Sequence, residues 1–123
     1  MKAVILAGGF GTRIRPLTYL HPKPMLPLVN RPFLYNFISW IRSYSIKDII
    51  LSIGYLSKDF EEYFGDGSSM GININYVIED KPLGTCGAVK NLEHLLENDC
   101  FMVFNGDVLS NINLTEMIKL HKD

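Results

Sequence analysis

Apolar runs and amphipathic stretches alternate along the chain. Four runs predict β-strands, because apolar residues gather in them and turn-forming residues bound them. The predicted strands are Lys2–Leu6, Asp48–Ile53, Asn73–Val77 and Phe101–Phe104. The third alternates polar and apolar residues, so we expect it near a sheet edge. The first is apolar on both faces, as a central parallel strand needs to be, and the last is apolar throughout.

Helical periodicity fills the segments between these strands. A helix is predicted from Pro32, a residue suited to the first helical position, because apolar residues recur after it at helical spacing. These residues are Leu34, Phe37, Ile38 and Ile41. Further helices are predicted over Lys58–Phe64, Thr85–Leu96 and Asn113–Lys122, the last two capped by their first residues. Strands that alternate with helices predict an α/β fold with a mainly parallel sheet.

One connection is unusually long. It runs from Ala7 to about Arg31, and its prolines are Pro16, Pro22, Pro24 and Pro27, with Pro32 closing it. Structureless loops of this length are uncommon in compact domains and are usually functional or disordered. Because prolines restrict the backbone, we expect this loop to be ordered and functional.

Composition and charge narrow the function classes. The chain has 123 residues, enough for one domain and too few for two. A hydrophobic fraction of 47% and a charged fraction of 20% are typical of a soluble globular protein. The net charge of −1 provides no global basic field, so neither nucleic acid nor a membrane is expected as a partner. No apolar run approaches the roughly 20 residues of a membrane span.

The two cysteines and the ends of the chain add three expectations. Cys86 and Cys100 lack the paired spacing of a zinc site and are predicted at interior positions. Nothing at the N-terminus resembles a signal peptide, so we expect a reduced, cytoplasmic protein. No further strand follows Phe101–Phe104 to cover it in the sheet, and we therefore expect the chain to be part of a longer one.

The clearest candidate for chemistry is the glycine-rich segment Leu6–Arg13, which directly follows the first predicted strand. Glycines let the backbone approach a ligand, consecutive N–H groups form an anion site, and Arg13 adds a planar cation. A P-loop would need lysine directly after Gly11, and a dinucleotide-binding loop would need a glycine where Ile14 stands. By itself the segment fits either an anion site or a tight turn beside a surface arginine.

Three further motifs join this segment. Lys23–Pro27 holds a lysine between prolines, and Pro82–Thr85 and Gly106–Asp107 follow in order. Together the four motifs resemble those of sugar-1-phosphate nucleotidyltransferases, which make NDP-sugars, and are closest to the mannose- and heptose-1-phosphate guanylyltransferases. The resemblance covers essentially the whole chain. It implies a Rossmann-like three-layer α/β/α fold, with residues 1–123 forming the N-terminal, nucleotide-binding part of a truncated nucleotidyltransferase domain.

The resemblance also implies residue roles. Members of the family join a nucleoside triphosphate to a sugar 1-phosphate and release pyrophosphate. By similarity Arg13 and Lys23 are catalytic, and Asp107 holds a catalytic Mg²⁺ ion. The implied nucleotide-binding residues are Leu6, Ala7, Gly8, Gly9, Gly11, Thr12, Arg13, Glu79, Pro82, Gly84 and Thr85.

These residue types suit the chemistry. A sugar phosphate is largely ionised near neutral pH, because its second pKa is about 6, and no general base is needed. The obstacle is to bring two polyanions together, so catalysis should rest on charge neutralisation and in-line positioning. Asp107 follows the strand Phe101–Phe104 and is expected at the carboxyl edge of the sheet, where its oxygens suit Mg²⁺. Taken alone, Asp107 would also fit a turn former.

Which nucleobase the chain binds, and whether it acts as an enzyme, are open to alternative interpretations. An ionised Glu79 only accepts hydrogen bonds, so it matches guanine, whose ring N–H and amine are adjacent donors; a solvated glutamate is the other interpretation. We therefore favour GTP over UTP or dTTP. A uridylyl- or thymidylyltransferase and a regulatory subunit without turnover are the alternatives. The expected partners are a nucleoside triphosphate and a sugar 1-phosphate, and a homo-oligomer is left open. By itself, this chain is expected to turn over poorly or not at all.

Overall fold

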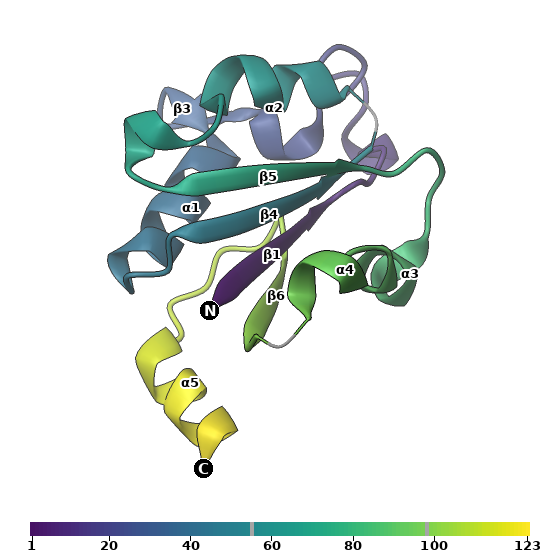
Figure 1. Ribbon diagram of the computed structural model, residues 1–123. Helices are drawn as coiled ribbons and strands as arrows, with labels where there is room; N and C mark the ends of the chain where they lie inside the picture. The colour runs from purple at the N-terminus through teal and green to yellow at the C-terminus, as the bar shows by residue number, and fades with distance from the viewer. Residues whose placement is uncertain (55, 98) are drawn as a thin grey trace.

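The computed structural model describes residues 1–54, 56–97 and 99–123 and contains a four-stranded parallel sheet. The strands are β1 (Lys2–Ala7), β4 (Asp48–Ile53), β5 (Asn73–Ile78) and β6 (Phe101–Asn105). Their order across the sheet is β5-β4-β1-β6, as Figure 1 shows. All four predicted strands are confirmed, and β5 lies at an edge as its alternating pattern predicts.

Helices cover both faces of this sheet (Figure 1). α1 (Phe33–Ser43) and α2 (Ser57–Phe64) pack on one face, and α3 (Gly84–Asn91) and α4 (Glu93–Leu96) pack on the other. Successive side chains of a strand point to opposite faces. Ile5 of β1 therefore joins the core under α1, whereas Val4 joins the smaller core under α4. The predicted three-layer α/β/α arrangement is confirmed.

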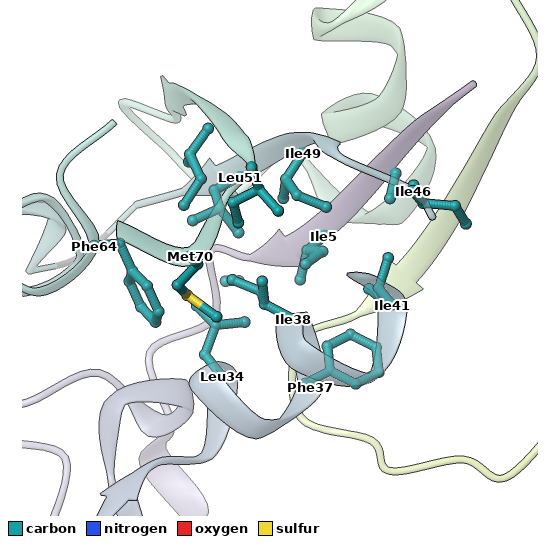
Figure 2. Close-up of a cluster of buried hydrophobic side chains, with 14 of the residues drawn as sticks. Ile5, Leu34, Phe37, Ile38, Ile41, Ile46, Ile49, Leu51, Phe64 and Met70 are labelled. Carbon is teal, nitrogen blue, oxygen red and sulfur yellow. The ribbon is translucent and has the colours of Figure 1, made fainter. Parts of the chain in front are cut away.

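The larger core forms around α1 (Figure 2). The four residues predicted as its apolar stripe are at most 1% exposed: Leu34, Phe37, Ile38 and Ile41. They pack against Ile5, Ile49 and Leu51 of the sheet and against Phe64 of α2. Since this core fixes β1 and β4 relative to each other, it also fixes where their carboxyl ends lie.

The long connection after β1 contains structure that periodicity did not predict. It holds two short 3-10 helices, η1 (Thr12–Ile14) and η2 (Lys23–Met25). A small antiparallel hairpin follows, formed by β2 (Pro27–Leu28) and β3 (Arg31–Pro32). The prediction of an ordered loop is confirmed, because these elements build it.

Three local predictions need correction. α3 begins at Gly84, with Leu83 before it as the N-cap, so Thr85 lies inside the helix and does not cap it. The predicted helix to Leu96 is two helices, because the backbone at Leu92 tightens and its N–H bonds back to the Val89 carbonyl. α1 begins one residue late, at Phe33, and Pro32 is its N-cap.

The cysteines also differ from expectation. Cys86 is exposed and Cys100 is half-buried, so neither is a fully interior residue. The first turn of α3, where Cys86 lies, is exposed, and burial against the sheet begins only at Ala88.

The last helix agrees with expectation. α5 spans Leu114–Lys122, and the Asn113 side chain accepts hydrogen bonds from the N–H groups of Thr115 and Glu116, which confirms it as the cap. No helix among the described residues is both long enough and apolar enough to traverse a bilayer.

Tyr76 of β5 supplies a first testable prediction, on stability. Its hydroxyl donates to the Gly65 carbonyl at 2.6 Å, and burial, aided by the nearby Glu61 and Asp66 carboxylates, raises the pKa of Tyr76 to about 12. Tyr76→Phe removes this hydrogen bond and should lower the free energy of unfolding by about 0.5–1.5 kcal/mol in urea titrations. Tyr63→Phe, on an exposed ring, is the matched control and should change it little.

The same residue predicts a pH dependence. The pKa of Tyr76 is raised in the folded chain above the ordinary value of 10. Its neutral form therefore contributes stability that is fully present below pH 10 and is lost as the pH rises toward 12. The difference in unfolding free energy between wild type and Tyr76→Phe should shrink over this range. A difference that grows with pH would contradict the assignment.

Candidate nucleotide site

Two adjoining cavities open at the carboxyl ends of β1 and β6. The Arg13 cavity, of about 320 Å³, is lined by Leu6, Ala7, Gly9, Gly11, Thr12, Arg13, Ile14, Lys23, Pro24, Asn105, Gly106 and Asp107. The Glu79 cavity, of about 250 Å³, is lined by Leu6, Gly8, Gly9, Glu79, Pro82, Leu83, Gly84, Thr85, Ala88 and Asn105. Leu6, Gly9 and Asn105 line both, so the two cavities share a wall.

Gly11 shapes the loop that borders the Arg13 cavity. Its φ of +60° lies in the left-handed region, and a Cβ there would come within 2.7 Å of the Thr18 methyl carbon. Thr18 is 1% exposed, and its hydroxyl donates to the Gly11 carbonyl at 2.7 Å. A side chain at position 11 would therefore displace the residue that holds the loop. This contact brings Arg13, in η1, to the cavity wall.

The ends of β1 and β6 are fastened together at Gly106. The Gly106 N–H donates to the Leu6 carbonyl at 2.8 Å, and a Cβ on Gly106 would lie 3.0 Å from that same oxygen. Such a close approach requires the small residue. Because Asp107 comes next, its carboxylate is placed on the same cavity as the glycine loop.

Lys23 and Asp107 form an ion pair across this cavity. The Lys23 Nζ lies 2.7 Å from the Asp107 Oδ2, and each side chain is 42% exposed. Lys23 comes from η2 in the long connection, and Asp107 follows β6, 84 positions later in the chain. Both charges therefore face the cavity, where solvent and a ligand can reach them. Half-exposed ion pairs contribute little stability, so this contact can be exchanged for others.

Asp107 meets the chemical requirements of a Mg²⁺ ligand. Its carboxylate oxygens are hard donors, and it is half-exposed on a cavity that also offers cationic groups for phosphates. In the part of the chain that the structure describes, no group of three or more histidine, cysteine, aspartate or glutamate side chains is placed to hold a metal ion by itself. Mg²⁺ commonly takes one or two carboxylates together with substrate phosphates and water. The donor set therefore fits a metal that is held jointly with a triphosphate.

Glu79 lies at the far end of the site, directly after β5. Its N–H donates to the Ile53 carbonyl at 2.7 Å, which extends the pairing of β5 with β4 by one step. Its carboxylate folds back toward the sheet, where the Ser52 hydroxyl donates to Oε1 at 2.6 Å. A Cβ on Gly8 would lie 3.1 Å from the same oxygen. Glu79 is therefore a held side chain and not a freely solvated one.

The sequence of the chain matches a known protein family over almost its whole length. A family model described as "Nucleotidyl transferase" matches residues 2–123. The chain belongs to this family.

Individual relatives agree with this affiliation. The chain is 49% identical over 122 residues to a mannose-1-phosphate guanylyltransferase of Mycobacterium tuberculosis, covering 99% of this chain and 34% of that protein. It is 40% identical over 121 residues to a D-glycero-alpha-D-manno-heptose 1-phosphate guanylyltransferase of Aneurinibacillus thermoaerophilus, covering 98% and 52%. The resemblance to mannose- and heptose-1-phosphate guanylyltransferases is confirmed. A UTP–glucose-1-phosphate uridylyltransferase of Synechocystis is 35% identical, covering 100% and 34%.

Solved structures agree as well. HddC from Yersinia pseudotuberculosis, complexed with GMP-PN, superposes with a TM-score of 0.88 at 33% sequence identity, covering 99% of this chain and 54% of that one. The chain thus spans between about a third and a half of the length of these relatives.

Every residue predicted for the nucleotidyl transferase site lies on one of the two cavities. The catalytic and metal candidates Arg13, Lys23 and Asp107 line the Arg13 cavity, and the base candidate Glu79 lines the other. Their roles toward a ligand stay predictions, because this placement shows proximity alone.

Three polar side chains in or next to the site were not predicted. Thr18 and Ser52 are the buried polar side chains among the described residues, and Asn105 lies in the shared wall. A serine within the apolar run of β4 is a signal that the sequence carries, since a buried hydroxyl needs a partner. Thr18 carries no comparable signal, because it lies in a loop where exposed threonines are common.

Proposed function

We propose that the chain binds a nucleoside triphosphate, GTP in preference, and that the protein transfers its nucleotidyl group to a sugar 1-phosphate. The products are an NDP-sugar and pyrophosphate. One observation carries the proposal: Arg13, Lys23 and Asp107 line a single cavity that adjoins the pocket of Glu79. The affiliation of the chain and its guanylyltransferase relatives support it.

The arrangement suggests how the nucleotide lies. The base would occupy the Glu79 cavity, and the triphosphate would cross the shared wall at Gly9 into the Arg13 cavity. Gly9 suits this crossing, because the space around a Cβ at that position is open to a distance of 4 Å. The phosphates would then reach the Arg13 guanidinium, whose planar fork suits two phosphate oxygens.

The residues would act through charge and position. The attacking sugar phosphate and the triphosphate are both anions, so Arg13 and Lys23 would lower their mutual repulsion. The backbone after β1 would fix the triphosphate for in-line attack. Asp107 would hold a Mg²⁺ ion, which when bound supplies Lewis-acid polarisation of phosphate oxygens. No proton needs to be removed by a side chain, because the attacking phosphate is already ionised.

The base preference rests on Glu79. Its carboxylate lines the cavity and accepts hydrogen bonds, as two adjacent donors on guanine require. Uracil and thymine present one donor beside an acceptor, so one of their groups would face a carboxylate oxygen without a hydrogen bond. The uridylyltransferase relative favours a second candidate, a chain that uses UTP.

A titration with five nucleoside triphosphates separates these candidates. Calorimetry of the chain with GTP, UTP, dTTP, CTP and ATP in excess Mg²⁺ should show the tightest binding for GTP. Tightest binding of UTP or dTTP would contradict the preference for GTP and favour a uridylyl- or thymidylyltransferase. Failure to bind any of the five would contradict the nucleotide site itself.

A substitution at Glu79 tests the base assignment directly. Glu79→Gln keeps one acceptor oxygen and replaces the other with a donor amide, so GTP affinity should fall about tenfold. Binding of inorganic tripolyphosphate, which lacks a base, should not change. Equal weakening of both ligands would show that Glu79 supports the fold of the site and does not select the base.

A further inference from the structure

Ser52 is an exception within its strand. β4 reads Asp-Ile-Ile-Leu-Ser-Ile, and Ser52 is 0% exposed at the position opposite Leu6 of β1 and Val77 of β5. A buried hydroxyl without a partner costs free energy relative to an apolar side chain of similar size. Its partner is the Glu79 carboxylate, with the Ser52 Oγ donating to Oε1 at 2.6 Å.

This hydrogen bond is one of three restraints on Glu79. The Glu79 N–H is held by the Ile53 carbonyl at 2.7 Å, which fixes where the side chain begins. The Ser52 hydroxyl holds the other end, at the carboxylate. The Gly8 backbone borders the carboxylate and leaves room for it only because it carries no side chain: a Cβ there would lie 3.1 Å from Oε1 and 3.3 Å from Oε2. A long, flexible glutamate side chain is thus kept in one orientation.

Ser52 itself lies outside the cavity that Glu79 lines. The residues around the Glu79 cavity come from the glycine loop, the segment after β5, the start of α3 and the end of β6, and Ser52 is not among them. Ser52 can therefore act on a ligand only through Glu79. Ile50 and Val4, on the same face of the sheet, belong to the small core under α4, so an apolar residue would have suited position 52 for packing alone.

We infer that Ser52 is a positioning residue for base selection: its hydroxyl holds the Glu79 carboxylate so that its free acceptor positions meet the paired donors of guanine. This inference rests on the proposed function, specifically on Glu79 as the base-reading residue. Orientation matters because two parallel hydrogen bonds require both acceptor atoms to lie in the plane of the base edge. A carboxylate free to rotate would lose part of this selectivity before losing any contact with the phosphates.

The test compares three variants of the chain by calorimetry. Ser52→Ala removes the hydroxyl and should weaken GTP binding about five- to tenfold, with inorganic tripolyphosphate bound as by wild type. Ser52→Thr keeps the hydroxyl and should retain the preference for GTP over ATP. Ser39→Ala is the matched control, since the Ser39 hydroxyl also donates within the fold, to the Tyr35 carbonyl at 2.8 Å, but on α1, away from the cavities.

A double substitution guards against a purely structural effect. If Ser52 acts through Glu79, Ser52→Ala combined with Glu79→Gln should weaken GTP binding no more than Glu79→Gln alone. Additive losses would overturn the inference, as would equal weakening of GTP and tripolyphosphate by Ser52→Ala. Should Ser52→Ala fail to fold, loss of the GTP-over-ATP preference by the folded Ser52→Thr variant would overturn it.

The outcomes also distinguish this inference from the proposed function. A wild-type chain that prefers GTP, with a preference that Ser52→Ala fully retains, overturns the role of Ser52 and leaves the proposed function standing. A wild-type chain that binds all five triphosphates equally overturns the base assignment of Glu79 and the role of Ser52 together.

Discussion

Replacing Arg13 by alanine should weaken GTP binding about 30- to 100-fold while guanosine binding changes less than twofold. The guanidinium lines the cavity proposed for the triphosphate. Charge-assisted hydrogen bonds contribute about 1.5–3 kcal/mol each, and a planar fork can form two with a phosphate. Guanosine has no phosphate and would occupy only the Glu79 cavity. Calorimetric titration of both ligands, in Mg²⁺ and at constant ionic strength, measures the difference.

Arg15 provides the matched control for this substitution. Arg15 is two positions away, and its replacement by alanine removes the same charge. Its guanidinium lies over the Tyr19 ring, with Cζ 5.2 Å from the ring centroid. Since it does not line either cavity, Arg15→Ala should weaken GTP binding less than threefold. Equal losses of GTP and guanosine on replacing Arg13 would contradict the phosphate-binding role.

Replacing Phe37 by alanine should lower the free energy of unfolding by about 3–5 kcal/mol. Phe37 is 1% exposed, and its ring packs against Trp40 and Phe104 with centroid distances of 5.6 and 5.5 Å. Truncation loses the buried ring and leaves a cavity between α1 and β6, which the surrounding backbone can fill only in part. Urea unfolding followed by circular dichroism measures the change.

A more conservative substitution at Phe37 tests whether the loss of stability depends on the volume removed. Phe37→Leu keeps an apolar side chain in the same place, so its loss should be clearly smaller than that of Phe37→Ala. A loss below about 1 kcal/mol for Phe37→Ala would show that the core under α1 collapses around the missing ring.

The sheet could be predicted from the sequence because its residues are distinctive. Val4 and Ile5 face opposite cores, so both must be apolar, and such a run marks a buried parallel strand. The break between α3 and α4 could not be predicted, since Val89, Leu92 and Leu96 keep helical spacing across it. Periodicity indicates which side chains face the sheet, but it does not indicate that the backbone tightens at Leu92.

Part of the candidate site could likewise be predicted from the sequence, and part could not. Arg13 and the glycines were found because a local motif holds them together. The pairing of Lys23 with Asp107 joins positions 84 apart: Lys23 lies in η2 of the long connection after β1, and Asp107 follows β6, which pairs with β1. Ser52 was missed because its role depends on a carboxylate from the next strand, a contact that no short motif contains.

If Asp107 holds a metal ion and Lys23 binds a phosphate, as proposed, the contact between these two side chains would couple metal binding to nucleotide binding. Each side chain now satisfies the other across 2.7 Å. Lys23 would be free to bind a phosphate when Asp107 holds the ion, and Asp107 would be free to hold the ion when Lys23 binds a phosphate. Each ligand thus removes a competitor of the other, and thermodynamic reciprocity requires both to gain affinity by the same factor. Mg²⁺ should therefore bind more weakly to the free chain than in the presence of a nucleoside triphosphate.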